Sequence, residues 1–271
     1  MVGALAQLPI DGDRIAELAC ERFAETSRNP QDEDHTIFWL VLADQCARRH
    51  IDAPEARGRA LAIIDSGADL VMHRDLGMSE RDVAKRAAML AALRPTLASP
   101  VDGARRRGVL RKPQPLLMAL GDCFVFPTSK GKGINSYYPS RAADRSFQQD
   151  GWGAGVVCEL GRAFGYLAWY RLCVLDETFA DPPDVARIRS GRFGPGLSAG
   201  TCSRTHFRRM ELAKIGSLPV VDGAIRQAVP ELVRQVRTPE TAAILDVSLC
   251  NNLRTGDGSF AGPLVTAVLG A

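Results

Sequence analysis

The spacing of apolar residues changes character near residue 100, and this change constrains the fold more than any other feature of the sequence. Before it, apolar residues such as Ile15 and Leu18 recur three and four positions apart, as on one face of an amphipathic helix. After it, residues 164–176, FGYLAWYRLCVLD, alternate with the two-residue period of a strand. The sequence therefore predicts an α+β protein built from two different parts.

Residues 1–96 are predicted to form a small helical bundle, because four amphipathic segments follow one another with short connections. Each segment carries end signals, such as an acidic or hydroxyl side chain before the first turn, proline in the first turn or glycine after the last. The predicted helices are Arg14 to Thr26 after an Asp13 cap, Asp34 to Arg49, Pro54 to a stop at Gly67, and a helix from the Ser79 cap to Pro95.

Asp65 and Asp69 are four residues apart at the end of the third predicted helix. Paired carboxylates at this spacing can perform acid–base chemistry, but Gly67 separates the two and is expected to end the helix between them. We therefore predict that both carboxylates are solvated surface groups.

Residues 97–115 are predicted to be a linker, because proline and glycine interrupt every periodic pattern there. The same stretch is basic, with Arg105, Arg106 and Arg107 in succession. Such a cluster is either a solvated connector or an arm that contacts phosphate groups. Overall charge does not decide between them, since the formal net charge of the whole chain is only +3.

Residues 116–271 are predicted to form an antiparallel β-rich domain, either a small twisted sheet or a partly open barrel, with a helical C-terminal extension. The sequence GRAFG, residues 161–165, is a good hairpin connection between two strands. Further along, residues 190–200, SGRFGPGLSAG, are predicted to be a loop, and residues 205–221 to supply a helical turn and a final strand. Thr238 is a candidate N-cap for a closing helix.

Residues 121–133, GDCFVFPTSKGKG, superficially resemble a loop that binds phosphate. A P-loop requires glycine five positions before its second glycine, and Ser or Thr directly after the lysine. Here Phe126 and Gly133 occupy those two positions, and no helical pattern follows. The stretch is better explained as a strand that enters a tight turn at Gly131 and Gly133.

Two constellations have the residue types of a catalytic nucleophile. GLSAG, residues 196–200, matches the pattern of a nucleophile elbow with Ser198 as the candidate, but no buried strand is predicted before it. Cys202 and His206 have the spacing of a thiol–imidazole pair or half a metal site, but no second pair of ligands accompanies them. A hydrolase or thiol enzyme is therefore the least favoured alternative, and we predict no metal and no cofactor.

The seven cysteines form no C-x-x-C pair, and several lie inside apolar runs. Scattered thiols of this kind are typical of small core residues in a reducing cytoplasm. The sequence shows neither the charged and apolar segments of a signal peptide nor a run of about 20 apolar residues. We therefore expect a cytoplasmic protein without membrane contact.

Aromatic and arginine side chains gather in the long connection after the first predicted hairpin strand. Tyrosine, tryptophan and arginine often anchor protein interfaces, and loops on a rigid scaffold often carry recognition. The candidate contact residues are Tyr137, Tyr138, Arg141, Arg145 and Trp152. Together with Tyr166, Trp169 and Tyr170, they also resemble a surface that stacks on nucleic-acid bases, although about half of these aromatics are expected in the core.

The order of segments resembles that of a group of bacterial two-part proteins. The similarity rests on TIFWLVLADQCARRHIDAPEARGRALAIIDSGADL and AKRAAMLAALRPTLASP, followed by a basic linker and the opening GDCFVFP, over residues 36–175. The second part is similar to immunity-protein family twenty-six of bacterial polymorphic-toxin systems. The resemblance implies a mostly β second domain with an SH3-like or similar small barrel, and a role in binding and neutralising a toxin. It supplies no catalytic residues.

These observations favour a non-enzymatic protein-binding module, with an immunity protein against a toxin as its specific form. A nucleic-acid-binding protein that uses Arg105, Arg106 and Arg107 with an aromatic sheet face is the alternative. The sequence predicts neither the identity of the partner nor the oligomeric state.

Overall fold

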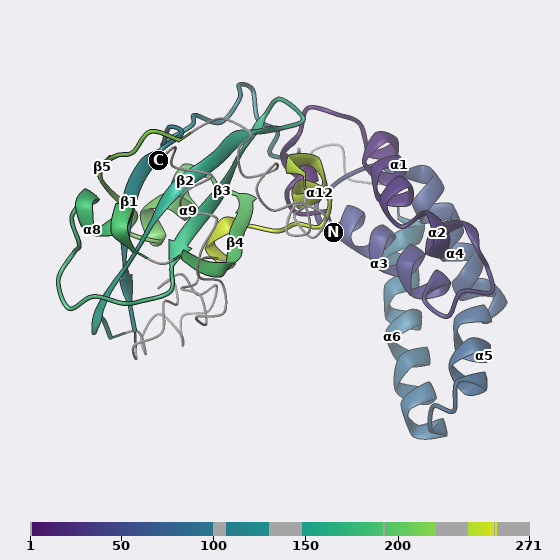
Figure 1. Cartoon of the computed structure of the whole chain (residues 1–271). Coiled ribbons are helices and arrows are strands. Elements are labelled where there is room, and N and C mark those ends of the chain that lie inside the picture. The colour runs from purple at the N-terminus through teal and green to yellow at the C-terminus, as the bar shows by residue number, and fades with distance from the viewer. Residues whose placement is uncertain are drawn as a thin grey trace. The chain divides into compact units, whose positions relative to one another are not determined.

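The computed structural model describes residues 2–99, 107–129, 148–191, 193–220, 238–251 and 253. The chain divides into two compact units, Met1–Arg111 and Lys112–Ala271 (Figure 1). Helices dominate the first unit and a β-sheet the second, so the protein combines α and β structure. None of the helices in these ranges has both the length and the apolar character needed to cross a membrane.

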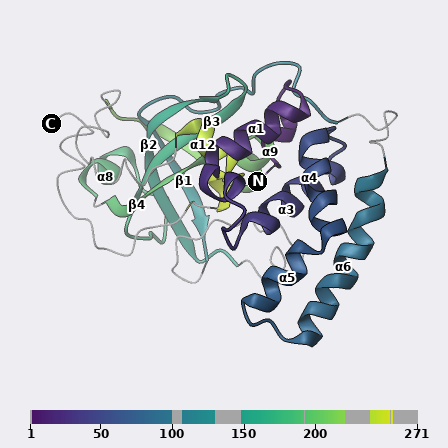
Figure 2. The same cartoon turned by 90° about the vertical axis from the view of Figure 1, so that its right-hand side faces the viewer.

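The helical unit begins with a short 3₁₀ turn, η1, and continues through six α-helices. Their bounds are η1 Leu5–Gln7, α1 Gly12–Arg22, α2 Ala24–Arg28, α3 His35–Arg48, α4 Pro54–Ser66, α5 Ala68–Asp75 and α6 Glu80–Ala98. Figures 1 and 2 both show α6 running beside α5. The core of this unit joins α3, α4 and α6 through buried side chains, which are Leu40, Ala43, Ala60, Leu90 and Leu97.

Local capping signals explain several of these helix ends. Ser79 accepts a hydrogen bond from the amide of Asp82 at the start of α6, as predicted. Gly67 ends α4 with a φ of +70°, in the left-handed region that glycine adopts without strain. The cap of α1 differs from the prediction, because Asp11 rather than Asp13 accepts the bond from the amide of Arg14.

Two predicted helix bounds were wrong, and one helix was not predicted. The first helix breaks at Phe23, whose φ of −112° and ψ of 46° are not helical, and whose ring packs against Phe38. After Gly67 the chain starts a new helix, α5, which the sequence pattern did not reveal. Pro95 does not end α6, because it falls in the last turn, where its carbonyl accepts the hydrogen bond from the amide of Ser99.

The second unit contains a five-stranded sheet in which all neighbouring strands are antiparallel. The order across the sheet is β4-β3-β2-β1-β5. The elements are β1 Asp122–Thr128, β2 Gly151–Ala163, β3 Leu167–Leu175, α8 Val185–Ser190, β4 Phe193–Thr201, α9 Arg204–Arg209, β5 Ala213–Ser217, α12 Pro239–Ile244 and the 3₁₀ turn η2 Leu249–Asn251.

The central hairpin of β2 and β3 confirms the prediction for residues 161–165. Ala163 pairs with Leu167, and the turn uses positive φ angles at Phe164 and Gly165. Every residue of β3 is buried, because both faces of the sheet are covered. One core cluster includes Cys173 and the other includes Tyr170, so the alternation along β3 divides its side chains between two interiors.

The prediction of a loop over residues 190–200 was wrong, because β4 spans Phe193–Thr201 and pairs with β3. The helical turn and strand expected over residues 205–221 are confirmed as α9 and β5, and Thr238 caps α12. The described strands form an open sheet with β4 and β5 at its edges. This sheet does not establish the SH3-like or small barrel, which stays a prediction. The expected turn at residues 131–133 lies outside the described residues.

Candidate functional site

The helical unit carries an apolar groove between α3 and α6, called here the α3–α6 groove. Its volume of about 470 Å³ is within the range of about 300–1,000 Å³ that is usual for ligand sites. The apolar lining residues are Ile37, Leu40, Val41, Met89, Leu90, Ala92 and Leu93, and the polar ones are Asp44, Arg48, Arg86 and Thr96.

The groove has a buried floor and an exposed wall on each side. Leu40 and Leu90 are buried and belong to the core of the unit. Val41 on α3 and Met89 on α6 are 37% and 52% exposed. Both are among the few large apolar side chains that the described surface leaves open to solvent.

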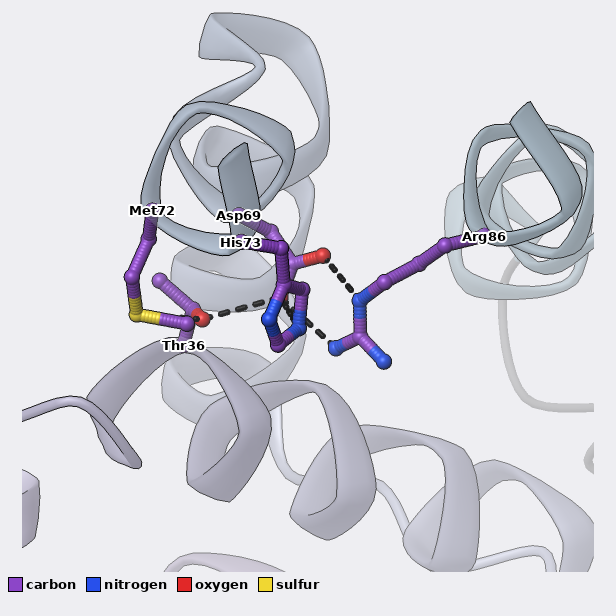
Figure 3. Close-up of polar contacts among 5 residues, drawn as sticks. All are labelled: Thr36, Asp69, Met72, His73 and Arg86. Carbon is purple, nitrogen blue, oxygen red and sulfur yellow. Dashed lines mark hydrogen bonds and ion pairs between the residues drawn. The ribbon is translucent and has the colours of Figure 1, made fainter. Parts of the chain in front are cut away.

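A buried polar cluster fixes the position of one groove residue, Arg86. From α6, its guanidinium donates to the carboxylate of Asp69 on α5, with Nε and Nη2 at 2.5 and 2.8 Å (Figure 3). The hydroxyl of Thr36 on α3 donates to the same carboxylate at 2.9 Å. Asp69 is fully buried, and these bonds tie α3, α5 and α6 together beside the groove.

The carboxylate of Asp69 stays charged despite its burial. Burial alone would raise the pKa of Asp69, but the hydrogen bonds from Arg86 and Thr36 and the charge of Arg86 outweigh it. The pKa of Asp69 is therefore held below its ordinary value of 3.8. Nε2 of His73 lies 3.8 Å from the carboxylate, beyond hydrogen-bond distance. The prediction that both Asp65 and Asp69 are solvated was wrong for Asp69, although Asp65 is exposed.

A smaller pocket of about 160 Å³ adjoins the groove, and Thr96 lines both. Ala43 and Leu97 contribute to its apolar side, and His50 and Arg57 bring two basic side chains. The Arg57 guanidinium lies 3.4 Å from the carboxylate of Asp52, and both side chains are partly exposed. This pocket therefore extends the α3–α6 groove toward the C-terminal end of α3.

Most of the contact residues predicted from the sequence lie outside the described residues, namely Tyr137, Tyr138, Arg141, Arg145, Arg105 and Arg106. Trp152 is described in β2, where its amide donates to the carbonyl of Phe179 at 2.7 Å and its partly buried side chain packs on the core. Nη2 of Arg107 donates to the carbonyls of Leu8 and Ile10, so this guanidinium is bound within its own unit. The structure therefore brings neither residue to the groove.

The aromatic sheet face considered for nucleic-acid stacking is largely interior. Trp169 and Tyr170 are fully buried, and Tyr166 is half-buried. Tyr170 accepts a hydrogen bond from the amide of Leu117 at 2.6 Å, and the guanidinium of Arg171 lies 5.1 Å from the centre of a Trp169 ring. Neither Trp169 nor Tyr170 is open to a base, because both belong to the packed interior of the sheet.

The candidate nucleophiles lie in settings that do not activate them. Ser198 lies within β4, paired with Leu172, whereas a nucleophile elbow places serine at a sharp turn between strand and helix. Burial raises the pKa of the Cys202 thiol to about 12, so the thiol is protonated. Burial, followed by the charge of Arg209, lowers the pKa of His206. Within the described ranges, no three His, Cys, Asp or Glu side chains are grouped so as to hold a metal ion.

Sequence reasoning missed the groove because the run IFWLVLA, residues 37–43, reads as apolar all round and therefore as fully interior. The available signal was Met89. In the fourth predicted helix, Val83, Ala87, Leu90 and Leu93 recur at helical spacing, and Met89 is a large apolar residue outside that stripe. Comparison of the chain with protein-family models, curated proteins and solved structures returned no match.

Proposed function

We propose that this chain is a non-enzymatic protein-binding module and that the α3–α6 groove receives an apolar segment of its partner. The observation that carries the proposal is the exposure of Val41 and Met89 on facing helices above the buried floor of Leu40 and Leu90. Binding there would remove exposed apolar surface from water, at about 25 cal/mol for each Å² buried.

The arrangement suits binding better than catalysis. The polar atoms at the groove are two arginines, one carboxylate and one hydroxyl, and the carboxylate of Asp44 is bound to Arg48 at 2.8 Å. The groove residues include neither a cysteine nor a histidine. Such a lining can hold and orient a partner, but it offers no paired acid and base for proton transfer.

The specific form of the proposal is an immunity protein that neutralises a bacterial toxin. The resemblance of residues 36–175 to bacterial two-part proteins, whose second part is similar to immunity-protein family twenty-six of polymorphic-toxin systems, supports this form. The expected barrel and bundle belong to the same proposal. The partner would then be a toxin domain.

Capture of partners from the cells that encode the chain, followed by mass spectrometry, tests the proposal. The bait proteins are wild type, Met89→Glu in the groove, and Val71→Glu as the matched control. Val71 is an apolar residue of α5 that is 54% exposed and does not line the groove. The two variants add the same charge at nearly equal exposure, and both are expected to fold, because each replaces a side chain that is about half exposed.

The proposal predicts a protein that wild type and Val71→Glu retain and that Met89→Glu loses. Equal retention by all three baits would place the binding surface elsewhere. Retention of nucleic acid by all three, in place of a protein, would favour the nucleic-acid alternative. Circular dichroism on each variant confirms that loss of binding is not loss of fold.

A further inference from the structure

We draw no further inference here: the strongest candidate, the apolar α3–α6 groove of the helical unit, carries nothing beyond the proposed function, because nothing in the part of the chain that the structure describes shows what covers it.

Discussion

The guanidinium of Arg86 binds the fully buried carboxylate of Asp69 through two hydrogen bonds and also lines the α3–α6 groove. The contact therefore links the interior of the helical unit to its candidate binding surface. Because Asp69 also accepts from Thr36, one carboxylate sets the spacing of α3, α5 and α6. This arrangement, the packing on both faces of the sheet and the burial of the thiols can each be tested by experiment.

Removal of Asp69 is expected to destabilise the protein strongly. Asp69→Ala leaves Arg86 and Thr36 without their acceptor, and we expect a loss of about 2–3 kcal/mol in the free energy of unfolding. This lies below the cost for a wholly buried pair, because Arg86 retains some contact with solvent. Asp65→Ala is the control, since its pair with Arg94 at 2.7 Å is exposed and should contribute little to the free energy of unfolding. Urea denaturation of the three proteins measures both values, and equal losses would contradict the structure.

Acidification should remove the contribution of Asp69. Because its pKa in the folded state is lower than its ordinary value of 3.8, the stabilisation is present above that value and is lost as pH falls through the folded pKa. The unfolding free energy of wild type should therefore fall more steeply than that of Asp69→Asn between about pH 4.5 and pH 2.5. Parallel curves would mean that the pKa of Asp69 is the same in the folded and unfolded states. Other carboxylates affect both proteins alike.

Replacement by alanine should destabilise the protein at one glycine of β2 and have little effect on stability at another. A Cβ at Gly155 would lie 2.4 Å from the carbonyl oxygen of Cys173 and 2.8 Å from the ring of Phe124, so Gly155→Ala should cost about 1–3 kcal/mol. A Cβ at Gly161 has no neighbour within 4 Å, and Gly161→Ala should be neutral within about 0.5 kcal/mol. Thermal unfolding distinguishes the two. A tolerated alanine at Gly155 would show that the sheet is not packed closely there.

One thiol should react in the native protein and six only after unfolding. Cys20 is half-buried, whereas the other six are buried and none of the seven forms a disulfide. Burial raises the pKa of Cys46 to about 11 and that of Cys202 to about 12, so their reactive thiolates are scarce near neutral pH. Alkylation near pH 8, read by mass spectrometry, should modify a single site that Cys20→Ser removes. Rapid modification of Cys202 would contradict its placement and revive the thiol alternative.

The elements predicted correctly from the sequence are those specified by nearby residues. Ser79 caps α6 and Gly67 ends α4, and each effect depends only on the residue itself and on the backbone of the adjacent helical turn. The hairpin between β2 and β3 was recognisable for the same reason, because Gly165 can adopt the positive φ that the turn requires. Strand β4 was missed because its glycine-rich sequence has little strand propensity, and it is a strand only through pairing with β3.

The candidate site was beyond sequence reasoning for a related reason. Whether Val41 is interior or open depends on which neighbours cover α3, and its own sequence does not specify them. Asp69 is the opposite case. A charged residue near a helix end is usually solvated. Asp69 is buried instead, because Arg86, seventeen positions away, pairs with it. The exposure of Val41 and the burial of Asp69 both depend on tertiary contacts, about which local sequence patterns carry little information.

Photo-crosslinking at position 89 tests the central claim most directly. A benzoylphenylalanine side chain would replace Met89 in one protein and Val71 in another, and each protein would be irradiated in the cells that encode it. The account predicts one protein adduct at position 89, identified by mass spectrometry, and no such adduct at position 71. The same adducts at both positions, or none at position 89, would contradict the claim that the α3–α6 groove is the binding surface.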